Sequence, residues 1–418
     1  MRSTVSRSLS YCAKNSLKSR NVLIVGAGIA GPTLAYFLQR FGAHPVVLER
    51  APQLRTTGQT IDVRDAGREV VRRLDIDRTI RERSTKEEGV AVVDSAGRTR
   101  AAFGVESFGG QGFVAEIEIL RGELVNILYE RTRDHVEYIF GDHLLSINNH
   151  EDHVQVTFAS GNIRKFDMVI GADGMRSNTR RLVFEDKSPI HHLDMYIAYF
   201  TIPYSQSDGT WSRWYNAPGG RSVVLRPDNQ GTTRALLSFR ESHRGYEDLD
   251  IDQQKQLLQN VFADAGFETP RILSGLKNAD DFYFEALGQV KLDQWSRGRV
   301  ALLGDAGYCA SPVSGMGTTL AFVGAYILAG EMSRHQNHTE AFRQYEALMR
   351  PYVTKAQKLL LGSTRIAAPQ TRTGIALRNT LLGLVAKPAV TGLITKLIQS
   401  KTAEKVTLPD YDNILAQQ

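Results

Sequence analysis

Three glycines near the N-terminus follow a short apolar run at a spacing that suits phosphate binding. The run Val22–Val25 leads directly into Gly26, Gly28 and Gly31, and a helical pattern begins at Pro32. Glycines at this spacing allow a tight turn, close approach of the backbone to a pyrophosphate, and close packing of helix on strand. The free N–H groups and the dipole of the helix N-terminus favour the negative charge of the phosphates.

A carboxylate follows at the distance that such a site requires. A second apolar strand, Pro45–Leu48, ends at Glu49, roughly 20 residues after the glycines, where a carboxylate can bind a ribose hydroxyl. The strand, the helix and this acid together predict a dinucleotide-binding site. The alternative is a glycine-rich turn without a ligand.

Two later buried strands also end in polar residues and glycines. The strand Met168–Ile170 leads into a Gly-Ala-Asp-Gly sequence that contains Asp173. An aspartate there is equally typical of a turn or a helix N-cap. The strand Arg299–Leu303 ends near Asp305, and a Gly-Met-Gly sequence follows shortly before a further helix. That helix start is a second place where backbone N–H groups can face an anionic or carbonyl group.

The segments between these motifs must position them. A chain of 418 residues can bury a large core and most often forms two packed domains. We expect an α/β fold (α+β overall), in which a Rossmann-like dinucleotide domain is interrupted by a mostly antiparallel sheet with one helix at about 251–265. The expected divisions are an N-terminal arm at 1–20, the first part of the dinucleotide domain at 21–183, a substrate domain at 184–290, the second part of the dinucleotide domain at 291–361, and basic amphipathic helices at 362–418.

The expected substrate domain is rich in aromatic residues. These side chains could line a site for a flat apolar molecule, or they could simply fill the core of the sheet. The residues considered for such a site are His191, His192 and Tyr215. No catalytic base can be named from the pattern, because a lone histidine is more often structural.

The composition excludes several kinds of protein. Apolar residues make up 42% and charged residues 23%, and no apolar run approaches the length of about 18 residues that spans a bilayer. The two cysteines, Cys12 and Cys309, lie far apart with no metal-ligand spacing around them. The sequence therefore predicts no metal site and no disulfide scaffold, and it favours a reducing, cytoplasmic location.

The net charge of +6 is concentrated at the two ends of the chain. Residues 1–48 contain six Lys or Arg and no acid, and residues 347–403 contain nine and no acid. This distribution is not the basic stripe of a nucleic-acid-binding protein. The basic ends could pack against an acidic body, or they could make peripheral contact with an anionic membrane. The Ser- and Arg-rich residues 1–20 fit a flexible arm, or alternatively a mitochondrial targeting segment.

The three motifs, in this order, resemble the class A single-component flavin-dependent aromatic monooxygenases of the hydroxybenzoate hydroxylase type, over residues 21–350. The stretches R-T-T-G-Q-T-I-D-V-R and I-L-R-G-E-L are most similar to the tetracycline-inactivating monooxygenases and their fungal and bacterial relatives. The resemblance implies an FAD enzyme of secondary metabolism that uses NADPH and O2. Through a flavin C4a-hydroperoxide it would hydroxylate or otherwise oxidise an aromatic, phenolic or polyketide-like small molecule.

The resemblance also implies roles for individual residues. The pyrophosphate and ribose of FAD would be bound by Gly26, Gly28, Gly31 and Glu49, and other parts of FAD by Asp62, Arg121, Asp173, Asp305, Pro312, Gly315 and Gly317. Arg55 matches a residue assigned to NADPH, and Asp173 belongs to a motif that serves both FAD and NADPH.

The chain departs from the family pattern at two positions. Ala306 is followed by Gly307 rather than the common histidine, and Gly324 stands where an acidic residue is common. The alternatives within the flavoenzymes are a dehydrogenase or a halogenase, the latter because Trp211 and Trp214 loosely match a halogenase motif. A non-catalytic flavin-binding protein is the alternative from another class. The oligomeric state, monomer or dimer, stays open.

Overall fold

The computed structural model describes residues 17–110, 117–184, 190–359, 363–401 and 408–412. Most of the expected N-terminal arm therefore lies outside the described residues. Within these ranges, no helix combines the length and the apolar character needed to cross a membrane.

A six-stranded sheet carries all three motifs. Its strands run in the order β17-β18-β11-β1-β2-β7, parallel except for β17. They are β1 (Asn21–Val25), β2 (His44–Glu49), β7 (Glu137–Phe140), β11 (Met168–Gly171), β17 (Ser296–Arg297) and β18 (Val300–Leu302). Val25 pairs with Gly171, and Gly171 pairs with Leu302. The carboxyl ends of β1, β11 and β18 therefore meet at one edge of the sheet, and the three motifs follow them there.

Helices and a small sheet cover the two faces of this sheet. The helices are α1 (Ala30–Arg40), α2 (Ala66–Arg73), α3 (Asp77–Glu82), α4 (Arg121–Thr132), α5 (Asn178–Phe184), α8 (Asp305–Tyr308), α9 (Gly317–Arg334) and α10 (His338–Gln357). α9 is buried along almost its whole length because it packs between α1, α2 and α10, which explains why it is apolar on all sides. The small antiparallel sheet contains β8 (Leu144–Asn149), β9 (Val154–Phe158) and β10 (Ile163–Phe166).

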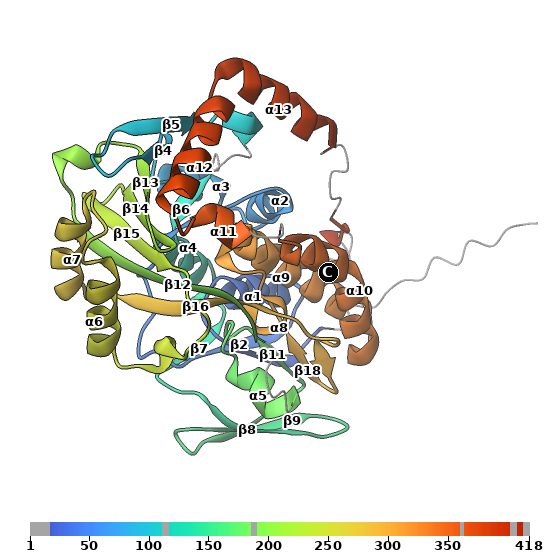
Figure 1. Ribbon diagram of the computed structural model, residues 1–418. Coiled ribbons are helices and arrows are strands. Elements are labelled where there is room, and N and C mark those ends of the chain that lie inside the picture. Colours follow the sequence, from blue (N-terminus) through green and yellow to red (C-terminus); the bar gives the residue numbers. More distant parts are fainter. Residues whose placement is uncertain (1–16, 111–116, 185–189, 360–362, 402–407, 413–418) are drawn as a thin grey trace, which may run out of the picture.

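A seven-stranded sheet forms the second layer of the molecule (Figure 1). Its order is β16-β12-β15-β14-β13-β4-β5, antiparallel except between β13 and β4. The strands are β4 (Gly89–Val93), β5 (Thr99–Gly104), β12 (Ile190–Pro203), β13 (Ser212–Ala217), β14 (Arg221–Pro227), β15 (Thr232–Phe239) and β16 (Tyr283–Val290). β4 and β5 join this sheet although they precede residue 184, a long-range pairing that the local pattern does not encode. The remaining domain divisions stay a prediction.

Two helices, not the single one expected, cover one face of the large sheet. α6 (Ile251–Phe262) and α7 (Thr269–Lys277) pack on apolar side chains of β12–β16 (Figure 1). The expectation of one helix at 251–265 is wrong, because α6 ends at Phe262 and α7 begins at Thr269. Gly266, with φ +82°, lies in the connection, and Pro270 lies in the first turn of α7.

C-terminal helices lie over part of the opposite face of the large sheet, where they contact β5, β13 and β12 (Figure 1). They are α11 (Ser363–Ala367), α12 (Arg372–Val385) and α13 (Pro388–Lys401). The short elements that complete the fold are β3 (Thr60–Asp62), β6 (Glu118–Leu120), η1 (Ser107–Gly110), η2 (Gln206–Asp208), η3 (Tyr246–Asp248) and η4 (Pro312–Ser314).

Candidate functional site

Two of the predicted glycines are required by the packing of the backbone itself. A Cβ on Gly26 would stand 2.5 Å from the carbonyl oxygen of Ala172, and its φ of +111° excludes most other residues. A Cβ on Gly31 would stand 2.0 Å from the carbonyl oxygen of Gly26. These two glycines let the first motif pack against itself and against the second motif.

Three other predicted glycines have open space where a Cβ would stand, and at Gly315 the φ of +62° itself favours glycine. A Cβ on Gly28 would meet no atom closer than the Arg121 guanidinium at 3.6 Å, and one on Gly315 or Gly317 would meet nothing within 4 Å. Gly317 is the first residue of α9, so unpaired N–H groups of its first turn lie beside that space. Open space in front of backbone donors fits a bound dinucleotide.

The loop that precedes β3 holds Arg121, the first residue of α4, beside the first motif. Its backbone N–H donates to the carbonyl oxygen of Gln59, and Gly122 packs so tightly on Thr56 that a Cβ there would overlap the carbonyl group. Burial lowers the pKa of the Arg121 guanidinium, and the nearby positive charge of Arg55 adds to that shift. The carboxylates of Glu49 and Asp305 raise this pKa, so both lie near the guanidinium.

Asp305 begins α8 directly after β18. Its side chain reaches solvent, yet protein atoms crowd it closely enough that desolvation raises the pKa of its carboxyl group, while Arg121 opposes the rise. A carboxylate that is both accessible and crowded is typical of the floor of a recess. We call the space bordered by Gly28, Arg121 and Asp305 the cofactor recess.

Glu49 is placed at the end of β2 with both carboxylate oxygens engaged. Oε2 accepts the N–H of Ala27 at 2.9 Å, and Oε1 accepts the N–H of Ala51 at 2.9 Å. The side chain therefore fixes the glycine-rich loop, and it remains partly accessible. Its predicted bond to a ribose hydroxyl stays a prediction.

Asp173 lies next to Gly26 and caps α5. Its Oδ1 accepts the hydroxyl of Ser177, and its Oδ2 accepts both the N–H of Thr179 at 2.9 Å and its hydroxyl at 3.0 Å. Its contacts within the protein are therefore those of a helix-capping aspartate, which was the alternative interpretation of the sequence. The cap also holds the second motif against the first.

The remaining predicted residues are Arg55, Pro312 and Asp62. Arg55 is exposed in the loop before β3, and Pro312 begins η4. Asp62, on β3, forms an ion pair with Arg64, in which Oδ2 lies 2.7 Å from Nη2. Its charge also acts on a buried group formed by Arg226, Glu87 and Glu118, and burial raises the pKa of Glu118 to about 8.

Two residues that the sequence reasoning missed face the cofactor recess from β16. Phe284 and Ala286 point into the core under α6 and α7, so Tyr283 and Glu285 point to the other side. The Tyr283 hydroxyl donates to Glu285 Oε2 at 2.8 Å. Burial raises the pKa of Glu285 to about 7, and Asp305 adds to the shift. The alternation of polar and apolar residues in this strand was the signal that could have found them.

The three residues considered earlier for a substrate site lie elsewhere. Tyr215 points into the core under α6 and α7 and donates to the carbonyl oxygen of Ala265, so it does not face the recess. His191 is exposed at the start of β12. His192 stacks on His243, with ring centroids 3.5 Å apart and an interplanar angle of 11°.

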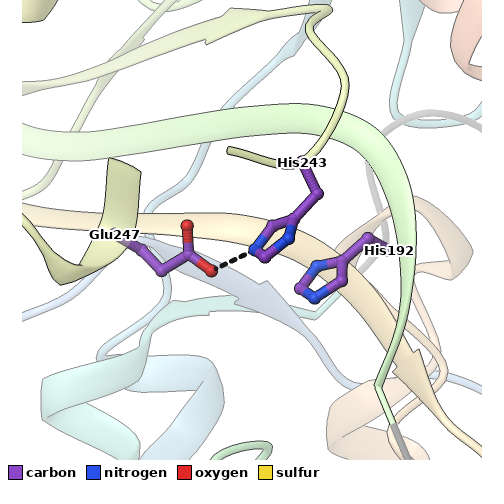
Figure 2. A group of neighbouring side chains, drawn as sticks. All are labelled: His192, His243 and Glu247. Atoms are coloured by element: carbon purple, nitrogen blue, oxygen red, sulfur yellow. Dashed lines mark hydrogen bonds and ion pairs between the residues drawn. The ribbon is translucent and has the colours of Figure 1, made fainter. Parts of the chain in front are cut away.

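The stacked histidines form a cluster with Glu247 (Figure 2). His243 Nε2 lies 2.8 Å from Glu247 Oε1, and Arg176 from the second motif lies 3.1 Å from the same oxygen. Ring nitrogens bind metals in the plane of the ring, so parallel stacked rings cannot both direct a lone pair at one ion. In this arrangement the cluster instead joins the second motif to the large sheet.

Comparisons with known proteins find a matching family and several relatives. A model of a family described as FAD binding domain matches residues 19–358. A flavin-dependent monooxygenase of Legionella longbeachae serogroup 1 (strain NSW150) is 41% identical over 343 residues, covering 82% of this chain and 88% of that protein. The FAD-dependent monooxygenase asL6 of Sarocladium schorii is 33% identical over 419 residues, covering 94% and 98%.

A solved structure resembles the whole fold. The tetracycline destructase Tet(51) superimposes with a TM-score of 0.78 at 32% identity, covering 94% of this chain and 100% of that one. The match extends to the second sheet as well as to the six-stranded sheet, because it covers nearly the full length of both chains.

Proposed function

Because the chain belongs to the FAD-dependent monooxygenases, we propose that it uses NADPH and O2 to insert one oxygen atom into a flat aromatic, phenolic or polyketide-like molecule. The observation that carries the proposal is the cofactor recess, where Arg121 and Asp305 face open space beside glycines that packing does not require. FAD, when bound, supplies the redox and oxygen chemistry. The protein binds and orients the reactants and excludes water.

The proposed FAD contacts follow from what each group can donate or accept. Gly28 and the first turn of α9 offer N–H groups to oxygens of the cofactor, and Arg121 offers a cation to a phosphate. Asp305 and Glu49 are acceptors for ribityl and ribose hydroxyls. Near flavin carbonyl groups the positive end of α9 stabilises negative charge by about 0.3–1 kcal/mol.

NADPH is proposed to dock transiently. In the described residues a single strand–glycine–helix unit suits a pyrophosphate, and FAD occupies that unit in the proposal. Arg55, exposed and close enough to shift the pKa of Arg121, would bind an NADPH phosphate at the rim.

A row of side chains across the large sheet suits a flat substrate. Direct pairing places five residues side by side on the face that lies away from α6 and α7. We call them the cross-strand row: Tyr283, Tyr199, Leu236, Val224 and Trp214. Four strand spacings of about 4.8 Å give the row a length of about 19 Å. That length fits a molecule of several fused rings, and the relative Tet(51) is named for tetracycline.

The test is to combine the FAD-loaded protein with NADPH, first without air and then with air and tetracycline. We expect NADPH to bleach the flavin absorbance, and the tetracycline product to gain the mass of one oxygen atom. A product without that gain, or a protein that binds no FAD, would contradict the proposal. Product that gains chlorine in the presence of chloride would favour the halogenase alternative.

We also propose that α12 and α13 make peripheral contact with an anionic membrane. Leu377, Leu381 and Leu393 are 63%, 53% and 70% exposed, and Lys387 and Lys396 lie in the same acid-free segment. We expect co-sedimentation with phosphatidylserine vesicles that is lost at high salt. Equal recovery with neutral phosphatidylcholine vesicles would contradict an electrostatic contact.

A further inference from the structure

Arg378 is a buried arginine on α12, beyond the residues that the FAD-binding family model matches. It is 8% exposed, and its guanidinium lies over the ring of Trp214, with Cζ 4.1 Å from the ring centroid. Its Nη1 donates to Asn216 Oδ1 at 2.7 Å and to Asn379 Oδ1 at 3.3 Å. These contacts fix the position of the group without neutralising its charge.

The other buried or half-buried arginines of the large sheet are paired with acids. Arg213 contacts Asp208, Arg226 contacts Glu87 and Glu118, and Arg234 contacts Asp228 and Asp281. For Arg378, the described residues supply no carboxylate partner, and burial alone lowers the pKa of its guanidinium to about 10. A buried cation held by neutral amides is costly unless an anion joins it.

Arg121 is an example of a desolvated arginine with a proposed anionic ligand. Burial lowers the pKa of its guanidinium as well, and the proposed function gives it an anionic partner, a phosphate of FAD. The two arginines stand at opposite ends of the cross-strand row. Tyr283 at one end lies close enough to affect the pKa of Arg121, and Trp214 at the other end lies under Arg378.

The same face of the sheet therefore carries an apolar and aromatic row with a cation at each end. Leu236, Val224 and Trp214 are only partly buried, so the row keeps accessible surface between its ends. The segment before α12 adds to the cover, because Ala368 packs with Tyr199.

We propose that Arg378 binds an anionic oxygen group of the substrate, a carboxylate or an ionised phenol or enol, and so holds a flat molecule over the cross-strand row with its other end at the flavin. This inference rests on the proposed function, since it takes the row as the substrate surface. It names the substrate class as planar anions and assigns α12 to substrate selection.

The test compares two probes of equal shape on the FAD-loaded protein: anthraquinone-2-carboxylate and anthraquinone-2-carboxamide. By calorimetric titration we expect the wild type to bind the carboxylate at least about tenfold more tightly than the amide. Arg378→Gln should weaken the carboxylate by about ten- to a hundredfold, to the level of the amide, and Arg378→Lys should retain part of the preference. Arg372→Gln, an exposed arginine of the same helix, is the matched control and should bind as the wild type does.

Equal affinities of the wild type for the two probes, including no binding of either, would overturn the inference and leave Arg378 as a residue that fastens α12 to the sheet. That comparison needs no variant, so it stands even if Arg378→Gln fails to fold. FAD content and oxygen insertion into tetracycline report on the proposed function separately. If the protein oxygenates tetracycline but does not prefer the carboxylate probe, only the inference is wrong. If it prefers the carboxylate probe but does not oxygenate tetracycline, only the proposed function is wrong.

Discussion

At each end of the cross-strand row, burial lowers the pKa of an arginine guanidinium, and the two arginines come from different parts of the chain. At one end, Arg121 faces the cofactor recess from a helix that the family model includes. At the other end, Arg378 lies over Trp214 on a helix that follows the last matched residue, Lys358. The proposals give each arginine an anionic partner, a phosphate of FAD for Arg121 and an oxygen group of the substrate for Arg378.

The two ends also differ in how tightly the backbone constrains them. Around the first motif the glycines separate into those that packing requires and those with open space in front of them. At the far end the constraint comes from side chains, through the stacking of Arg378 on Trp214 and its bond to Asn216. Substitutions should therefore have sharper structural consequences at the cofactor end.

Gly31→Ala should have the largest effect. Its Cβ would stand 2.0 Å from the Gly26 carbonyl oxygen, so we expect destabilisation by more than about 4 kcal/mol and little folded protein. Gly28→Ala is the matched control, because its nearest neighbour is a mobile guanidinium at 3.6 Å. It should fold with nearly the wild-type Tm and bind FAD poorly. If Gly28→Ala loads FAD normally, the open space beside Gly28 is not the cofactor site.

Asp305→Ala should keep the fold and lose FAD. The carboxylate begins α8 and reaches solvent, and the buried Cys309 thiol beside it keeps its bond to the Gly288 carbonyl oxygen at 3.8 Å. A lost bond between a charged acceptor and a cofactor hydroxyl, by contrast, costs about 1.5–3 kcal/mol. We expect the Kd for FAD, measured by quenching of flavin fluorescence, to rise by about ten- to a hundredfold. Asp293→Ala, an exposed aspartate in the chain before β18, should change nothing. An Asp305→Ala protein that is yellow and fully loaded with FAD would contradict the assignment of Asp305 to FAD binding.

Arg121→Gln and Arg378→Gln should separate the two ends. We expect the first variant to raise the Kd for FAD by about tenfold or more while keeping any carboxylate preference once FAD is saturating. The second should keep the wild-type affinity for FAD and lose that preference. Loss of both properties in either variant would show that the ends act as one site and would break the comparison.

The backbone arrangement at the Arg121 end was largely predictable, because it depends on local order along the chain. The Gly26–Gly31 spacing, the acid at Glu49 and the strand before Asp305 each encode a turn at the end of a parallel strand. The parallel pairing of β1, β11 and β18 then brings those turns together, as the α/β expectation implies.

The substrate end was not predictable, because it depends on pairings across the chain. Arg378 of α12 lies over Trp214, a residue more than 150 positions earlier in the chain. No local pattern distinguishes Arg378 from the other basic residues of the C-terminal segment. The same reason explains why β4 and β5 were expected in the first domain, and why Tyr215, on the opposite face from Trp214, was considered for the site.

Glu285→Gln should change how stability depends on pH. The pKa of Glu285 is about 7 in the folded protein, above its ordinary value of 4.5, so the folded state binds more protons than the unfolded state between these values. Wild-type stability therefore falls as pH rises from about 4.5 to 7, and FAD phosphates in the recess would add to the shift. The Tm of Glu285→Gln relative to wild type should be higher at pH 8 than at pH 5. Glu106→Gln, an exposed control, should show no such trend. A constant difference at both pH values would place Glu285 outside the recess.

Arg55→Ala should have the smallest effect and should test whether the rim of the recess serves NADPH. Arg55 is exposed, and exposed charge pairs contribute about 0–1 kcal/mol, so we expect a two- to fivefold rise in the KM for NADPH, roughly, with unchanged FAD content. The rise should grow as ionic strength falls, because screening weakens the contact with a phosphate. Arg98→Ala, on the β4–β5 hairpin, is the matched exposed control. An unchanged KM would move the docking of NADPH away from this rim, while a loss of FAD would mean that Arg55 belongs with Arg121 to the cofactor end.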